Sequence, residues 1–179
     1  SQLTEAMAGL DRTQELMNMT EEDNPEVRTI VLDKINGNII FDNVSFSYDE
    51  GKEVLHHISF EAPSGSVTAL VGSSGSGKST IAGLAATFLN PSEGKVTLDT
   101  IDLSKVNLSS FRSQLGVVLQ DDFLYEGTIR ENILFPRPNA TEEQVHEAIK
   151  GAYVDEFTNR FEEGLDTVSV RKANGRMTD

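Results

Sequence analysis

The stretch GSSGSGKST, from Gly72 to Thr80, limits what this chain can fold into more than any other feature of its sequence. Its spacing matches G-x-x-x-x-G-K-[ST], a loop whose backbone amides surround phosphate groups. Its composition would also suit a flexible Gly/Ser linker. The flanking sequence decides against a linker, because the apolar run SVTALV (66–71) precedes it directly and an amphipathic pattern follows it. A strand, a loop and a helix in this order are what a phosphate-binding loop requires.

The residue types in this stretch predict how it would hold a nucleotide. Glycine permits positive φ and lets the main chain approach a ligand closely. Lys78 would bring a positive charge to the β and γ phosphates, at a helix N-terminus that also attracts anions. Ser79 offers a hydroxyl to Mg²⁺, and Thr80 can reach the α phosphate. The predicted nucleotide-binding residues are Gly72, Ser73, Ser74, Gly75, Ser76, Gly77, Lys78, Ser79 and Thr80.

The segments around the loop predict an α/β fold with an antiparallel β appendage. Residues 39–48 alternate between apolar and polar side chains, and EVLHHISFEA (53–62) follows after a turn, which together predict an antiparallel hairpin. The apolar runs 66–71 and 115–119 predict buried strands of a mostly parallel sheet. Apolar residues at helical spacing over 81–89 predict a helix after the loop, and KVTLDTIDL (95–103) predicts a strand and turn. TEEQ at 141–144 is a capping-box pattern that predicts the start of another helix.

Composition narrows the function. The formal net charge of −14 argues against a nucleic-acid-binding surface, although one local anion site needs no overall positive charge. The chain has no cysteine, which excludes disulfides, thiolate metal sites and a cysteine nucleophile. No apolar run approaches the roughly 18 residues that would span a bilayer.

The segments FDNVSFSY, LHHISF, GSVTALVGSSGSGKST and GVVLQDDFLYEGTIRENI occur in an order that resembles the nucleotide-binding domain of ABC transporters. The likeness is greatest to exporters, in which the ATPase domain follows the membrane helices on one polypeptide. It covers residues 30–168 and implies a core of the P-loop NTPase type. Residues 1–29 would then be an amphipathic helix and an acidic linker from the membrane domain, and residues 169–179 an atypical tail. The helix could equally be peripheral, with no link to a membrane domain.

The resemblance also implies roles for residues outside the loop. Tyr48 stands where the family places an aromatic ring that stacks on adenine, and otherwise would be a hairpin or core residue. Gln120 stands where a glutamine contacts Mg²⁺ or the attacking water, and otherwise would be a polar residue closing a strand. Residues 123–133 resemble the segment that docks on the transmembrane domain, so its apolar residues 123–125 are either an exposed patch or core. Thr100 departs from the family, which often has glycine there.

The implied function is an ATPase on the cytoplasmic face of a membrane, with ATP and Mg²⁺ as cofactors. Its partners would be the transmembrane domain of the same transporter and a second nucleotide-binding domain. The family's LSGGQ signature, catalytic glutamate and switch histidine are not in these 179 residues. We therefore expect an incomplete domain that binds ATP without efficient hydrolysis. A non-hydrolysing regulatory module and an ABC-type ATPase that acts outside membranes remain the alternatives.

Overall fold

The computed structural model describes residues 2–19, 21–49, 51–119 and 123–169. They form two compact units, residues 1–117 and residues 118–179, and each unit is described by itself.

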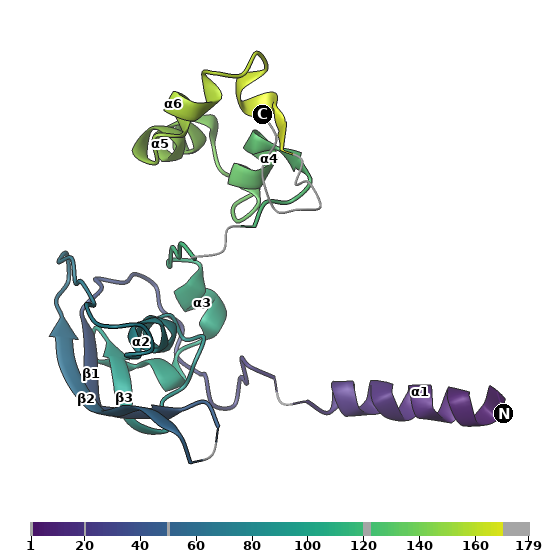
Figure 1. Cartoon of the computed structure of the whole chain (residues 1–179), viewed down its shortest axis with the longest axis vertical. Helices are drawn as coiled ribbons and strands as arrows, with labels where there is room; N and C mark the ends of the chain where they lie inside the picture. The colour runs from purple at the N-terminus through teal and green to yellow at the C-terminus, as the bar shows by residue number, and fades with distance from the viewer. Residues whose placement is uncertain (1, 20, 50, 120–122, 170–179) are drawn as a thin grey trace. The chain divides into compact units, whose positions relative to one another are not determined.

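The first unit is built on a four-stranded antiparallel sheet (Figure 1). Strand β1 (Ile39–Ser47) lies between β2 (Glu53–Ala62) and β3 (Glu93–Leu98), and β3 also pairs with β4 (Ile101–Asp102). The β1–β2 hairpin confirms the prediction from the alternating pattern, and the pairing of β3 with β4 confirms the strand and turn predicted over 95–103.

One face of this sheet carries the hydrophobic core of the unit. Helix α2 (Lys78–Ala85), the 3₁₀ helix η1 (Leu103–Lys105) and helix α3 (Leu108–Arg112) contribute to the same buried cluster as the strands. The cluster contains Phe41, Val44, Phe46, Leu55, Leu84, Val96, Leu98, Leu103, Val106 and Phe111. Leu84 anchors α2 in this core, which fixes the helix that begins at the phosphate loop.

The mixed α/β class is confirmed. The prediction that two further segments form strands of a parallel sheet is wrong for the described residues. Neither 66–71 nor 115–119 is a strand, and Val67, Val71 and Val118 are 98%, 93% and 93% exposed. The described strand pairs are all antiparallel, and the one parallel contact is an isolated bridge between Ile30 and Val106. An apolar run becomes a buried strand only when neighbouring strands pair with it, and no described segment pairs with either run.

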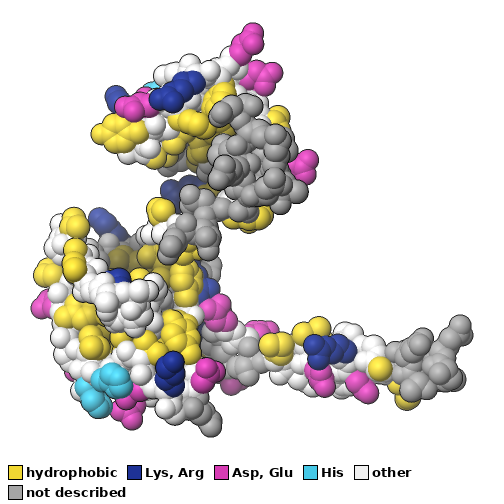
Figure 2. Space-filling model, in the orientation of Figure 1, with side chains coloured by type: hydrophobic (Ala, Val, Ile, Leu, Met, Phe, Trp, Pro, Cys, Tyr) yellow, Lys and Arg dark blue, Asp and Glu magenta, His cyan; other side chains and the backbone are white. Residues whose placement is uncertain are grey.

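The N-terminal segment forms helix α1 (Gln2–Met17), in agreement with the helix expected within residues 1–29. From residue 7 onward its apolar side chains are solvent-exposed, with Met7 at 64%, Leu10 at 69% and Met17 at 80%. Figure 2 shows hydrophobic and charged side chains mixed along it. Within the described ranges, no helix combines the length and the hydropathy needed to cross a bilayer.

The second unit is a small group of helices with one two-stranded ribbon. It contains β5 (Gly127–Thr128), α4 (Ile129–Leu134), α5 (Glu142–Gly151), α6 (Val154–Thr158), the 3₁₀ helix η2 (Gly164–Asp166) and β6 (Val168–Ser169). The predicted capping box of α5 is present: Gln144 N–H donates to the Thr141 hydroxyl, and the Gln144 side chain accepts from Thr141 N–H. These reciprocal bonds define where α5 begins.

Candidate phosphate-binding site

The predicted phosphate loop leads directly into helix α2. Gly75 and Gly77 have φ values of +80° and +86°, in the left-handed region that glycine adopts without strain. At Gly77 a second constraint applies, because a Cβ built there would lie 2.6 Å from Cδ2 of Leu55. The glycine at this position therefore permits both the turn and the close approach of the loop to β2.

Lys78 lies folded over the loop. Its Nζ donates to the carbonyl oxygens of Gly72 at 3.0 Å and Ser73 at 2.6 Å, and to Oγ of Ser76 at 3.3 Å. These bonds hold the ammonium against the loop backbone. The Lys78 side chain therefore lies beside the glycine-rich loop, and its contact with phosphate stays a prediction.

The N-terminus of α2 leaves backbone donors available. Gly77 is the N-cap and has no side chain that could accept from the first turn. The first backbone bond runs from Ile81 N–H to the Gly77 carbonyl at 2.9 Å, so the amides of Lys78, Ser79 and Thr80 have no partner within the helix. Free amides at a helix N-terminus beside a lysine form an environment that attracts anions.

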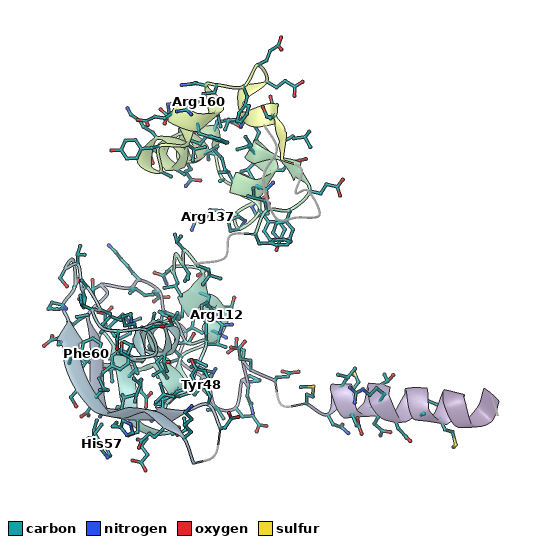
Figure 3. All side chains as sticks on the ribbon, viewed as in Figure 1. Tyr48, His57, Phe60, Arg112, Arg137 and Arg160 are labelled. Atoms are coloured by element: carbon teal, nitrogen blue, oxygen red, sulfur yellow. The ribbon has the colours of Figure 1, made fainter. Side chains whose placement is uncertain are left out.

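Three of the hydroxyl-bearing residues proposed from the sequence, Ser79, Thr80 and Tyr48, have different surroundings. Ser79 is exposed, so its hydroxyl is accessible to a metal ion in solution, whereas Thr80 is buried. Tyr48 follows β1 and is 59% exposed, and its Oη lies 3.1 Å from Oγ1 of Thr80. The structure thus brings Tyr48, labelled in Figure 3, together with Thr80, which lies 32 residues later in the sequence.

Gln120, predicted to position the metal or water, lies outside the described residues. Its role stays a prediction. No group of three or more His, Asp or Glu side chains that could hold a metal ion is found in the described part of the chain.

The segment predicted to dock on a membrane domain exposes its aromatic residues. Phe123 and Tyr125 are 64% and 46% exposed, and Leu124 is 37% exposed, which favours the surface-patch interpretation over the core one. The Tyr125 ring stacks on Phe135 at 4.0 Å and meets Phe123 edge-on at 4.9 Å. What this cluster contacts stays a prediction.

Sequence reasoning missed that the acidic linker is bound to the first unit. Arg28 is buried and donates to the carbonyls of Leu103 at 2.9 Å and Val106 at 3.2 Å. Asp23 accepts from the Leu108 amide at 3.0 Å, at the start of α3. Among these contacts, only the start of α3 has a local sequence signal: Asn107 is its N-cap, and asparagine is a preferred residue at that position. A bond between residues some 80 positions apart leaves no such pattern.

Comparison with known proteins identifies the family of the chain. The sequence profile described as "ABC transporter" matches residues 55–175. The chain is 43% identical over 167 residues to the uncharacterized ABC transporter ATP-binding protein YknV of Bacillus subtilis (strain 168), covering 93% of this chain and 28% of that protein. It is 42% identical over 145 residues to the ATM1-type heavy metal exporter of Novosphingobium aromaticivorans, covering 81% of this chain and 24% of that protein.

Among solved structures, one described as a bacterial Atm1-family ABC exporter with ATP bound superposes with a TM-score of 0.81 at 38% identity, covering 93% of this chain and 29% of that one. The chain thus spans between 24% and 29% of the length of these relatives. The profile match extends over more than half of the chain and includes the whole phosphate loop. By sequence and by fold, the chain belongs to the ABC transporter family.

Proposed function

We propose that this chain is the ATP-binding segment of the cytoplasmic ATPase domain of an ABC exporter. The observation that carries the proposal is Lys78, whose ammonium lies within 3.0 Å of the Gly72 and Ser73 carbonyls at the start of α2. A lysine that lies against a glycine-rich turn, beside amides that have no partner within the helix, provides the groups that bind a triphosphate.

The residues present fit both ATP and Mg²⁺. The amides of α2 and the Lys78 ammonium would bind phosphate oxygens, and the Ser79 hydroxyl would be one ligand of the metal. Bound magnesium would neutralise charge on the β and γ phosphates. The exposed face of the Tyr48 ring is available to stack on adenine, and Gln120 is proposed as a further contact to the metal or to the attacking water.

The transport activity belongs to the longer assembly. We propose that this segment works with a transmembrane domain of the same transporter and with a second ATP-binding domain, at the cytoplasmic face of the membrane. ATP binding would bring the two ATPase domains together, and hydrolysis would separate them. The exposed aromatic residues of 123–133 would transmit this motion to the membrane domain, because a patch of this kind is suited to a protein contact. We propose that residues 1–179 bind ATP without efficient hydrolysis, and that turnover requires the assembled transporter.

The proposal is tested by measuring the affinity of the chain for MgATP with and without Lys78. We expect Lys78→Ala to weaken binding by about tenfold or more, because charge-assisted contacts to phosphate are among the strongest polar interactions. Lys95→Ala is the matched control, since Lys95 pairs with Asp42 at 3.5 Å on the sheet and, among the described residues, forms no hydrogen bond or ion pair with the loop. Equal affinity of the wild type and Lys78→Ala would refute the phosphate-site assignment.

A further inference from the structure

The contact between Tyr48 and Thr80 joins an exposed side chain to a buried hydroxyl. Tyr48 is 59% exposed and Thr80 is 4% exposed, and their oxygens lie 3.1 Å apart. The Phe46 ring meets the Tyr48 ring edge-on, with centroids 4.8 Å apart and planes at 89°. Tyr48 is therefore held at both ends, by Phe46 against its ring and by Thr80 at its hydroxyl.

The chemistry of the two hydroxyls indicates which one donates. A phenol hydroxyl is a stronger hydrogen-bond donor than an aliphatic hydroxyl, because the ring withdraws electron density from its oxygen, so Tyr48 is the better donor and Thr80 the better acceptor. When Tyr48 donates, the proton of the Thr80 hydroxyl remains available. Thr80 makes no other side-chain hydrogen bond with the described residues, although a buried donor normally has a partner.

The position of Thr80 indicates what that proton can bind. Thr80 is the third residue of α2, in the turn whose backbone amides lack helical partners, and it follows Lys78 by two positions. An anion bound by these amides and by the Lys78 ammonium would lie close to the first turn that contains Thr80. A hydroxyl that accepts one hydrogen bond also donates a stronger one, because hydrogen bonds in a chain polarise one another.

We propose that the Tyr48 hydroxyl donates to Thr80 and so directs the Thr80 proton toward the phosphate chain of the bound nucleotide. Tyr48 is then a positioning residue for phosphate, separately from any contact between its ring and the base. The inference rests on the proposed function, because it requires that phosphate binds at this loop. It predicts that the hydroxyl of Tyr48 matters even for a ligand that has no base.

Inorganic tripolyphosphate with Mg²⁺ is the probe that separates the two roles of Tyr48. Tyr48→Phe keeps the aromatic ring and removes only the hydroxyl. We expect this variant to bind tripolyphosphate about three- to tenfold more weakly than the wild type, the loss typical of one hydrogen bond that supports a charged contact. Tyr153→Phe is the matched control, since Tyr153 is a 70% exposed tyrosine of the second unit, and it should bind as the wild type does.

A double-mutant cycle with Thr80 tests whether the effect passes through that residue. Thr80→Val is close in shape and removes the hydroxyl, so we expect Tyr48→Phe to cause no further loss in the Thr80→Val background. Thr80→Ser keeps a hydroxyl and should keep the sensitivity to Tyr48→Phe. Circular dichroism melting of each variant confirms that the fold is retained.

Two outcomes overturn the inference while leaving the phosphate site intact. One is unchanged tripolyphosphate binding by Tyr48→Phe, which would confine the role of Tyr48 to its ring. The other is an equal loss from Tyr48→Phe in the wild-type and Thr80→Val backgrounds. If the wild type binds MgATP but not tripolyphosphate, the inference also fails and the proposed function stands. If Lys78→Ala binds MgATP as tightly as the wild type does, the proposed function fails and the inference fails with it.

Discussion

Arg112, at the end of α3, binds Glu22 of the acidic linker through both terminal nitrogens of its guanidinium. Nη1 donates to Oε2 at 3.0 Å and Nη2 donates to Oε1 at 2.6 Å, across a separation of 90 residues. The hydrogen bond from Arg112 lowers the pKa of Glu22, and the same bond raises the pKa of Arg112. Arg112 Nη2 also donates to the carbonyl of Thr87 at 3.0 Å, just beyond the C-terminus of α2. Arg112, labelled in Figure 3, thus links the residues that follow α2 to the acidic linker.

The Glu22–Arg112 pair should contribute measurably to the stability of the fold. In a double-mutant cycle with Glu22→Ala and Arg112→Ala, we expect a coupling of about 1 kcal/mol at low salt, because the contact is bidentate. The coupling should fall in 1 M salt, since the Glu22 side chain is 58% exposed and screened by ions. The coupling is measured by urea unfolding of the wild type, the two single variants and the double variant.

The pair Arg12–Glu15 on α1 is the control for that cycle. It has a single contact of 3.4 Å between side chains that are 78% and 70% exposed. We expect its coupling to stay below about 0.5 kcal/mol. A coupling for Glu22–Arg112 no larger than this would contradict the view that the linker is fastened to the first unit.

The turn between β3 and β4 should be strained at Thr100. Leu98 pairs with Ile101, so Asp99 and Thr100 are the two central residues of a tight hairpin, with φ values of +50° and +76°. Asparagine, aspartate and glycine suit such positions, whereas a β-branched residue does not. We expect Thr100→Gly to raise the free energy of unfolding by about 1 kcal/mol, measured by urea or thermal unfolding.

For Thr97→Gly, in strand β3 of the same hairpin, we expect the opposite effect on stability. Thr97 pairs with Ile40 and with Asp102 in extended conformation, so glycine there should lower the stability by about 1 kcal/mol. If both glycine substitutions lowered the stability equally, the strain at Thr100 would be disproved.

Asp99 should make the stability of the first unit depend on pH. Its carboxylate accepts from the amides of Asn36 at 2.6 Å, Gly37 at 3.1 Å and Asn38 at 2.9 Å. Burial by itself raises the pKa of Asp99, but the three amide bonds outweigh it and hold the pKa below its ordinary range. Because the pKa is lowered on folding, this stabilisation is present above the unfolded pKa of about 3.9 and is lost as the pH falls through the folded value.

The substitution Asp99→Asn isolates this contribution. Asparagine offers one acceptor oxygen in place of two and carries no charge, so we expect a loss of about 1–2 kcal/mol at pH 7. The difference between the wild type and the variant should shrink when urea unfolding is repeated at about pH 3. A difference that stays constant between pH 7 and pH 3 would show that the charge of Asp99 is not what stabilises the turn.

Local patterns explain which parts of the fold could be predicted. The β1–β2 hairpin, α2 and the capping box at Thr141 follow from residues close together in sequence, and each appears in the structure. The phosphate loop belongs to the same class, because its glycines and Lys78 act within nine residues. Short-range signals of this kind depend on backbone conformation and on caps, which neighbouring residues determine.

The features that escaped prediction depend on partners far away in sequence. The apolar segment 66–71, which includes Val67 and Val71, was predicted to be a buried strand, yet no strand in the described part of the chain pairs with it. Glu22 was predicted only as part of an acidic linker, because no local pattern indicates that Arg112, 90 residues later, is its partner. The contact between Tyr48 and Thr80 was missed for the same reason, although both residues were assigned to the site individually.

We expect a substitution at Gly77 to impair phosphate binding more than it impairs the stability of the fold. Its φ is +86°, and a Cβ at this position would lie only 2.6 Å from Leu55 Cδ2, so any side chain must displace the loop or the leucine. We expect Gly77→Ala to weaken MgATP binding by about tenfold or more, since the amides and Lys78 follow the turn directly. The free energy of unfolding should fall by about 1–2 kcal/mol.

The substitution Gly94→Ala is the control that separates an effect on the stability of the fold from an effect on MgATP binding. It has a φ of +74°, and a Cβ there would collide with the backbone carbonyl of Asn43 in the neighbouring strand. Because a backbone carbonyl in a paired strand cannot move aside as a leucine can, we expect Gly94→Ala to destabilise the unit more than Gly77→Ala does. Its folded fraction, however, should bind MgATP with wild-type affinity, since the phosphate loop is unchanged. If Gly77→Ala bound MgATP normally while it lost stability, the close packing of the loop against β2 would serve the fold alone.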